Sequence, residues 1–549
     1  KEVSEEEGTG IVHIAPGCGA EDFGVGKEQG LPPVAPLSEE GTYLEGFDWL
    51  TGKAAVSRDV VEEIIANLKE KGVLFATEQY PHRYPHCWRC KTELLYRLVD
   101  EWYISMAWRE EINVVTKQVT VLPTEINGKA LELDWLSNMG DWMISKKRFW
   151  GLALPIWVDE ETGDFEVIGS YEELKERAVE GWDKFEGHSP HRPWIDLVKI
   201  KNPKTGNLMS RIGDVGNPWL DAGIVPYSTM GYNTDREEWE KWFPADFITE
   251  CFPGQFRNWF YAILAMSTMM ENRPPFKTLL GHGLVRDQFG HAMHKTAGNS
   301  IAFEQAADEG YQAPNAKGKV ESHLPMGADV ARWLYCRNNP VANINFGPKT
   351  ADEVRKGFVL KLWNTYAFFS NYARLDDFDP TAEQVPLSKR DDFDRWILSD
   401  LQNLIKTAHD SFKEYNVMAF CLEAERFIDD KLSNWYVRRN KRRFWKGEQG
   451  DDKLAAYQTL YTVLMTLSKL LAPVVPFLTE VMYQNLKADG DPESVHLCDF
   501  PQVDESLTDS ELSADMASLL KVVSLGSAAR NAMKIKVRQP LAELKLRPG

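Results

Sequence analysis

The chain has 549 residues, which is too long for one ordinary core, because globular domains contain roughly 100–200 residues each. Its 43% hydrophobic and 26% charged residues are typical of a soluble globular protein, and we expect no membrane span, because no apolar run approaches the ~20 residues required. Seven scattered cysteines argue against a disulfide framework and favour a cytoplasmic location. The net charge of −19 does not support general nucleic-acid binding, so RNA contact requires local basic patches.

The first region is rich in glycine and β-branched residues. Residues 8–17 predict a short buried strand that ends in a glycine-rich loop, where the backbone can approach a ligand closely. His13 lies before this loop, and Glu21 and Asp22 follow it, so a carboxylate is available to hold an ammonium group. A purely structural loop is the alternative. The chain begins without Met, and we expect its natural start to lie upstream.

Cys87 and Cys90 form a CxxC knuckle, which is the spacing at which two thiolates bind zinc. A tetrahedral site needs two more ligands. His82 and His86 are close in sequence, but the chain has no second CxxC. The knuckle therefore predicts either a zinc site or a loop that lacks its partner pair.

Residues 131–350 mix short apolar strands with helical stretches, which favours an α/β domain. The run at 146–150, Lys-Lys-Arg-Phe-Trp, combines basic and aromatic side chains that suit RNA or nucleotide contact. A solvated basic hinge between domains is the alternative. Residues 281–299 predict a strand followed by a loop bearing Lys295, whose charge can neutralise a phosphate leaving group. A solvated surface lysine is the alternative there.

After Pro348 the apolar spacing becomes helical, and residues 395–445 and 454–486 predict an antiparallel helical bundle. Residues 510–530 predict a further amphipathic helix, and 541–546 look strand-like. The strongest basic patch of the chain places six positive charges within nine residues: Arg438, Arg439, Lys441, Arg442, Arg443 and Lys446. This patch predicts phosphate contact. The alternative is a salt-bridged helix that faces acids such as Asp429 and Asp430.

The order of these motifs resembles the class I aminoacyl-tRNA synthetases for isoleucine, valine and leucine over nearly the whole chain. The block at 8–23 is similar to the editing motif of that family, and 141–151 to the link between its editing and catalytic domains. The matching stretches further on are 214–223, 255–260, the KMSKS-like loop at 289–299, 394–398 and 433–445. The stretches 87–102, 140–155 and 535–540 resemble the isoleucine type.

The resemblance implies a multidomain fold, α/β plus all-α. The expected parts are the C-terminal part of a β-rich editing domain (1–75), a connective segment with the knuckle (76–135), the second half of a Rossmann-type catalytic domain (136–350), an antiparallel helical anticodon-binding bundle (351–505) and the start of a C-terminal region (506–549). The implied activity is that of an isoleucine–tRNA ligase. It uses ATP with Mg²⁺ as a substrate and hydrolyses mischarged Val-tRNA(Ile). Zn²⁺ is a further expected ligand. We expect a monomer without membrane association.

The resemblance also assigns roles to residues at matching positions. The catalytic loop would use Met293, Lys295 and Thr296, and the editing site would use Thr9, His13 and Asp22. The amino-acid pocket would contain Trp219, Asp221, Gln255 and Trp259. The tRNA would be bound by Trp435, Arg438, Arg439, Lys441, Arg442 and Arg443, and zinc by Cys87 and Cys90.

The sequence departs from the family pattern at several points. The HIGH motif of the family does not occur, so we expect this chain alone not to activate amino acids. Ala292 replaces the first lysine of the KMSKS loop, Gly254 replaces an expected acid, and a polar insertion occupies about 305–326. The alternatives are a valine- or leucine-type enzyme, or a non-catalytic tRNA-binding paralogue.

Overall fold

The computed structural model describes residues 10–79, 81, 83–87, 90–295, 298–315, 317–445 and 450–546. The chain divides into two compact units. Unit 1 contains Lys1–Met106 and Asp141–Pro218, and unit 2 contains Ala107–Gly140 and Trp219–Gly549. The division is discontinuous in sequence, and therefore differs from the boundaries expected near residues 75, 135 and 350.

The first hundred residues of unit 1 contain little regular β structure. Helices α1 (Ala20–Glu28) and α2 (Arg58–Glu70) are joined by loops with isolated bridges, so the expected β-rich region is largely irregular. The predicted buried strand is wrong for its described part, because residues 10–15 form no strand and Ile11 is 84% exposed. A strand pairs its backbone groups with a neighbouring strand, and residues 10–15 belong to none of the described sheets.

The rest of unit 1 contains a five-stranded antiparallel sheet in the order β6-β5-β9-β8-β7. Its strands are β5 (Ile156–Val158), β6 (Phe165–Val167), β7 (Ala178–Glu180), β8 (Lys199–Lys201) and β9 (Leu208–Arg211). Helices α5 (Tyr171–Arg177) and α6 (Trp182–Phe185) add buried side chains to the same core. Trp157 is fully buried there, and its indole N–H donates to the carbonyl oxygen of Val198 at 2.9 Å. Short ladders join β1 (Tyr103–Ile104) to β3 (Trp142–Met143) and β4 (Ser145–Lys146) to β10 (Val215–Gly216).

Unit 2 contains a parallel sheet in the order β11-β12-β2, with strands Ala245–Cys251, Phe276–His282 and Thr120–Leu122. The helices near it are α3 (Arg109–Lys117), α4 (Gly128–Asn138), α7 (Pro218–Gly223), α8 (Val225–Ser228), α9 (Arg236–Trp242), α10 (Phe252–Gln255) and α11 (Trp259–Glu271). Most of α11 is buried, which suits its almost continuous apolar sequence. The segment 107–140, of which residues 107–135 were expected in the connective segment, supplies α3, β2 and α4 to this α/β half.

A second pair of parallel strands, β13 (Val285–Asp287) and β16 (Ile344–Phe346), flanks the KMSKS-like loop. The polar insertion between them contains an antiparallel hairpin of β14 (Tyr311–Pro314) and β15 (Val320–His323). Helix α12 (Ala328–Arg337) follows this hairpin. The insertion predicted at 305–326 is therefore a structured element.

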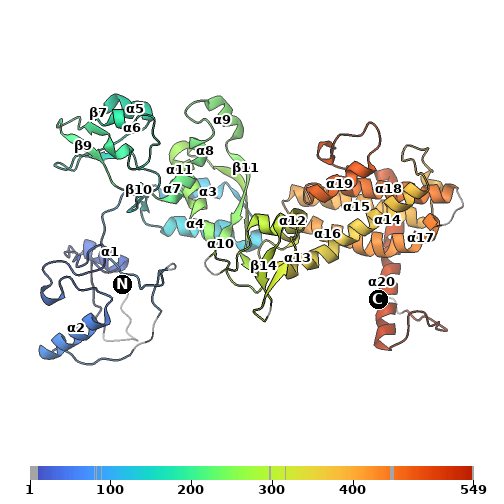
Figure 1. Ribbon diagram of the computed structural model, residues 1–549, viewed down its shortest axis with the longest axis horizontal. Coiled ribbons are helices and arrows are strands. Elements are labelled where there is room, and N and C mark those ends of the chain that lie inside the picture. The colour runs from blue at the N-terminus through green and yellow to red at the C-terminus, as the bar shows by residue number, and fades with distance from the viewer. Residues whose placement is uncertain are drawn as a thin grey trace. The chain divides into compact units, whose positions relative to one another are not determined.

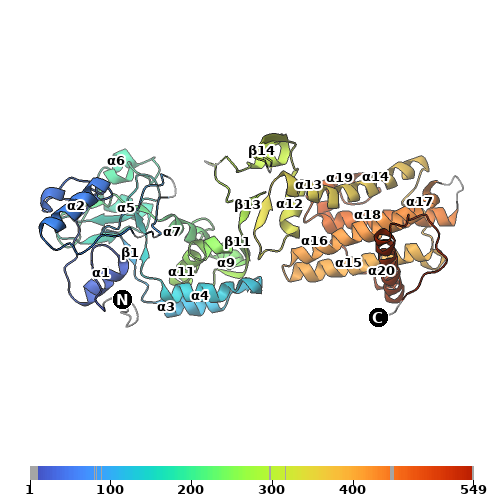
Figure 2. The same cartoon turned by 90° about the horizontal axis from the view of Figure 1, so that it is seen from below.

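The C-terminal part of unit 2 is the predicted antiparallel bundle, in which α14, α15 and α18 run side by side (Figures 1 and 2). Its helical segments are α13 (Pro348–Val354), η6 (Arg355–Val359), α14 (Leu360–Leu375), α15 (Asp392–Lys413), α16 (Val417–Arg426), η8 (Phe427–Val437), α17 (Arg438–Trp445), α18 (Asp451–Leu471) and α19 (Pro476–Leu486). One core extends from Ala306 to Met516, and Trp333 of α12 stacks on Phe358 with ring centroids 3.6 Å apart. The expected boundary at residue 350 therefore lies inside a continuous core.

Helix α20 (Ser510–Ala532) confirms the last predicted helix, but its exposed apolar character was not expected. Among the described residues it is the one helix whose length and hydropathy, 1.2 on average, would allow it to cross a membrane, and only 6% of that window is buried. Such a helix was not expected from the sequence. The strand-like stretch at 541–546 forms no strand.

Candidate functional site

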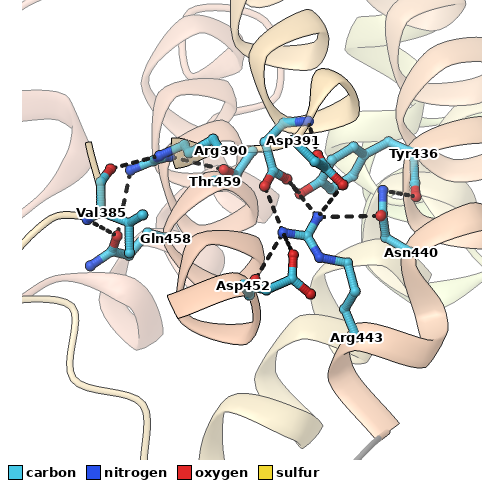
Figure 3. Close-up of polar contacts among 10 residues, drawn as sticks. Val385, Arg390, Asp391, Tyr436, Asn440, Arg443, Asp452, Gln458 and Thr459 are labelled. Atoms are coloured by element: carbon cyan, nitrogen blue, oxygen red, sulfur yellow. Dashed lines mark hydrogen bonds and ion pairs between the residues drawn. The ribbon is translucent and has the colours of Figure 1, made fainter. Parts of the chain in front are cut away.

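The basic helix α17 is attached to the bundle by a buried cluster around Arg443 (Figure 3). The guanidinium donates to both carboxylate oxygens of Asp394, at 3.0 and 2.7 Å, and the Tyr436 hydroxyl donates to the same carboxylate at 2.6 Å. Asp391 and Asp452 lie 3.2 and 2.9 Å from the guanidinium. These five residues, here named the Arg443 clasp, connect α17 and η8 to both α15 and α18.

The clasp forms because α15 begins there. Asp391 is the N-cap of α15 and accepts the backbone N–H of Asp394 at 2.8 Å, which places two carboxylates at the helix start. Beside it, Arg390 donates to the carbonyl oxygen of Val385 at 3.0 Å and to the Thr459 hydroxyl at 2.9 Å (Figure 3). The start of α15 is thus fixed to α18 from two sides.

The charges and the burial around the clasp bear on two residues that the sequence assigns to tRNA contact, Arg443 and Trp435. Burial opposes the charge on Arg443, but the carboxylate of Asp394 holds the guanidinium pKa above its usual value. Burial raises the pKa of Asp391. Because Arg443 is bound to three carboxylates and only 12% of its side chain is exposed, it does not present its charge to RNA. Trp435 is also buried, at 8% exposure, so neither of these two residues expected at the tRNA surface is presented to solvent.

The remaining positive charges of α17 do face solvent. Arg438, Arg439 and Arg442 are exposed, and Lys441 is half-buried. The guanidinium of Arg439 lies over the ring of Trp435, 4.6 Å from its centre, in a cation–π contact. Within the described part of the chain, Arg438 and Arg442 form no ion pair with a carboxylate. The structure therefore brings together a compact cationic surface in an acidic chain.

Asp429 and Asp430 are the acids that the sequence offers as partners of this helix. Among the described ion pairs, neither is paired with α17. Asp429 pairs with Lys361 of α14 and accepts a hydrogen bond from Asn434 at 2.6 Å. The actual partners of Arg443 precede it by about fifty residues or follow it by nine, at helix starts. Sequence reasoning missed them because ion-pair partners across a bundle leave no spacing signal. The acidic run 391–394 contains two of the three carboxylate partners, Asp391 and Asp394, and is the signal that the sequence offered.

The KMSKS-like loop is closed by a hydrogen-bonded pair at its base. The Asn299 amide donates to the Asp287 carboxylate at 3.0 Å and to the carbonyl oxygen of Ala292 at 2.9 Å. Asp287 also accepts two loop N–H groups at 2.9 Å. Burial opposes its ionisation, but these donors lower the pKa of Asp287. Lys295 is exposed at the tip of the loop, Met293 is half-buried, and Thr296 lies outside the described residues.

The expected pocket residues lie on adjoining elements of unit 2. Trp219 and Asp221 belong to α7, Gln255 ends α10, and Trp259 begins α11. The Gln255 side-chain oxygen accepts the backbone N–H of Trp259 at 3.3 Å. Both tryptophans are half-buried, and Asp221 is exposed.

A close backbone contact fixes α7 against α11. A Cβ at Gly223 would lie only 2.9 Å from the carbonyl oxygen of Ala262. Glycine is therefore required where the two helices meet. This contact holds the helices that carry Trp219 and Trp259 against each other.

The editing-type loop is compact. A Cβ at Gly17 would lie 1.8 Å from the carbonyl oxygen of Val34, and a Cβ at Gly26 would lie 2.7 Å from the Pro16 ring. Asp22, in the first turn of α1, accepts the backbone N–H of Ala15 at 3.2 Å. His13 is exposed beside this loop, and Thr9 lies outside the described residues.

The CxxC knuckle has the backbone of a ligand loop but not a complete ligand set. Cys87 donates its backbone N–H to the carbonyl oxygen of Thr92 at 2.8 Å, and hydrogen bonds from Thr92 lower the pKa of Cys90 to about 7. His86 directs Nδ1 to the carbonyl oxygen of Tyr84 at 2.9 Å. His82 lies outside the described residues. Among those described, no group of three or more His, Cys, Asp or Glu side chains could hold a metal. Two thiols would be half of the ligands that a tetrahedral zinc site needs.

Comparisons with known proteins match two successive parts of the chain to family models. The family model described as tRNA synthetases class I (I, L, M and V) matches residues 20–347, and the anticodon-binding domain of tRNA ligase matches residues 394–546. The isoleucine–tRNA ligase of Clostridium tetani is 39% identical over 552 residues, which cover 99% of this chain and 50% of that protein. That of Thermus thermophilus is 38% identical over 546 residues, with 98% and 50% covered. The chain spans about half the length of the curated relatives it matches.

Proposed function

We propose, from the premise that this chain belongs to the class I tRNA synthetases of the isoleucine, leucine, methionine and valine group, that it forms part of an isoleucine–tRNA ligase. The observation that carries this proposal is its 38–39% identity, over nearly all its residues, to ligases of that name. In this proposal the whole enzyme activates isoleucine with ATP and Mg²⁺. It then transfers the acyl group to the terminal ribose of tRNA(Ile).

The activation site uses the loop closed by Asp287 and Asn299. Lys295 stands exposed at its tip, where an ammonium group can stabilise the charge that develops on pyrophosphate. Met293 belongs to the same loop, and the role expected for Thr296 concerns a residue outside the described part of the chain. Since Ala292 occupies the position of a second lysine, the loop brings one ammonium group instead of two.

The amino-acid pocket is formed by Trp219 and Trp259, with Gln255 and Asp221 at its polar edge. A hydrophobic pocket separates isoleucine from valine by only ~1–3 kcal/mol, because the two side chains differ by one methylene group. The enzyme therefore hydrolyses mischarged Val-tRNA(Ile) at a second site. In that site Asp22 holds the ammonium group of the amino acid, and His13 lies beside the ester. Thr9, expected in the same site, is outside the described residues.

The RNA surface of the bundle consists of Arg438, Arg439, Lys441 and Arg442. We expect the variant R438A/R439A/R442A to bind tRNA(Ile) more weakly, with a salt dependence whose slope falls by about 2–3, because each phosphate contact contributes about one. Electrophoretic mobility shifts at several salt concentrations measure this. The matched control is R426A, which removes an arginine that is 69% exposed on α16. Equal effects of the two variants would contradict the proposal.

A second candidate, a non-catalytic tRNA-binding paralogue, is favoured by Ala292 alone. Isoleucine-dependent exchange between ATP and pyrophosphate by the full-length protein separates the candidates, and parallel assays with valine and leucine test the choice of amino acid. We expect isoleucine to support exchange by the full-length protein, and this chain alone to show none.

A further inference from the structure

A second surface that combines aromatic and basic side chains lies in unit 1. It is formed by the run 146–150 and by the segment between α6 and β8. Trp150 is 66% exposed, yet one face of its ring stacks on His191, with centroids 4.8 Å apart and planes 8° apart. Phe149 is 60% exposed and has the Arg192 guanidinium 5.0 Å from its ring centre. These four residues are here named the aromatic platform.

Hydrogen bonds of Arg192 and close backbone packing at Gly151 hold the platform residues in place. Arg192 donates to the carbonyl oxygen of Gly213 at 2.6 Å and to Asp196 at 2.8 Å. Gly151, with φ of +155°, follows Trp150, and a Cβ there would lie 3.1 Å from Val215. The backbone thus passes tightly against β10, while the two preceding rings project outward. The rings are prepositioned, so a ligand that stacks on them loses little of the chain's own conformational freedom.

The charges around the platform fit an anionic partner. Within the described residues, Lys146 and Arg148 form no ion pair with a carboxylate, whereas Lys147 pairs with Asp214 at 2.9 Å. The guanidinium of Arg192 is partly neutralised by Asp196. Two uncompensated cations therefore border two exposed rings, in a chain whose net charge is −19.

We propose that the aromatic platform binds unpaired nucleotides of RNA. Bases stack on the outer faces of Trp150 and Phe149, and the phosphates between them pair with Lys146 and Arg148. A duplex does not fit this surface, because its bases are already stacked and paired. The identity of the natural ligand, the unpaired part of a tRNA, rests on the proposed function.

The test uses the full chain and a fluorescein-labelled 12-nucleotide single-stranded RNA, followed by fluorescence anisotropy. Stacking on one aromatic ring corresponds to about a 5- to 150-fold change in dissociation constant, so W150A should weaken binding within that range. W150F should retain part of the affinity, because a smaller ring still stacks. The same RNA annealed to its complement should bind no more tightly than the W150A variant binds the single strand.

Trp242 on α9 supplies the matched control. It is 64% exposed, but its indole N–H donates to Glu238 at 2.8 Å, and the same carboxylate neutralises the adjacent Lys241. W242A should leave binding unchanged, and K146A/R148A should lower the salt slope by about 1–2. Circular dichroism establishes that each variant is folded. Equal affinity of W150A and the unmodified chain, or equal loss in W150A and W242A, would overturn the proposal.

The two proposals fail separately. If R438A/R439A/R442A weakens tRNA binding while W150A changes nothing, the platform is wrong and the proposed function stands. If W150A weakens single-strand binding while the chain binds no tRNA, the platform stands and the source of its RNA is wrong.

Discussion

Removing Arg443 should destabilise the bundle far more than removing its neighbour Arg442. The R443A variant leaves the Asp394 carboxylate, which is fully buried, with only the Tyr436 hydroxyl as a side-chain donor. Breaking a buried ion pair from one side costs ~3–5 kcal/mol, because the other charge stays buried without compensation. Asp391 and Asp452 also lose their shared cation, so we expect a value towards the upper end of that range.

The complementary variant gives a smaller loss. D394A leaves Arg443 in contact with two other carboxylates, of which Asp452 is 72% exposed, so we expect about 3 kcal/mol. Urea unfolding followed by far-ultraviolet circular dichroism measures both free energies of unfolding. R442A removes an exposed cation of the same helix and should change the free energy by less than about 0.5 kcal/mol. A loss in R443A no greater than that in R442A would refute the reasoning.

Three further predictions concern unit 2. G223V should lower the free energy of unfolding by ~1–3 kcal/mol in urea, because the added atoms overlap α11, and unchanged stability would show that the helices separate freely. E132Q should stabilise the chain increasingly from pH 4 to pH 7: burial raises the pKa of Glu132, whose carboxylate oxygens have no hydrogen-bond partner, so the unfolded chain loses its proton first and stability falls as pH rises. A pH-independent effect of E132Q in urea titrations would contradict this. N299A should open the loop and accelerate tryptic cleavage after Lys295, and an unchanged cleavage rate would show that Asn299 does not hold the loop.

The resemblance inferred from motif order is confirmed by the family matches and by the identity to relatives along the chain. The bundle could be predicted because its apolar residues recur at helical spacing, as Leu401, Leu404, Ile405 and Ala408 do on α15. The cationic face of α17 was predicted as well, since Arg438 and Arg442 are exposed as the charge run indicated.

The errors have physical causes. The run 8–17 has strand propensity, but its described part, residues 10–15, belongs to none of the described sheets, because propensity alone does not determine a strand. Arg443 lies within the basic run and looks like its neighbours in sequence, but the start of α15 places two carboxylates beside it. Charge runs show where cations are, whereas only the packing shows which ones are already neutralised.

The hydrophobic core is not divided at residue 350, where the spacing of apolar residues changes. A change from mixed to helical spacing near 350 marks a change of secondary structure. The core crosses that point, because Arg332 and Trp333 of α12 reach the bundle, where Arg332 donates to the carbonyl oxygen of Val474 at 2.8 Å. Hydrophobic periodicity reports the kind of element and not the extent of a core.

The most direct test of the account is competition binding of this chain to tRNA transcripts for isoleucine, valine and leucine at two salt concentrations. The account predicts salt-dependent binding with preference for the isoleucine tRNA, because the exposed arginines of α17 meet phosphates and the chain matches isoleucine–tRNA ligases along its length. Equal binding to all three transcripts, or none, would contradict the proposal that the chain forms part of an isoleucine–tRNA ligase.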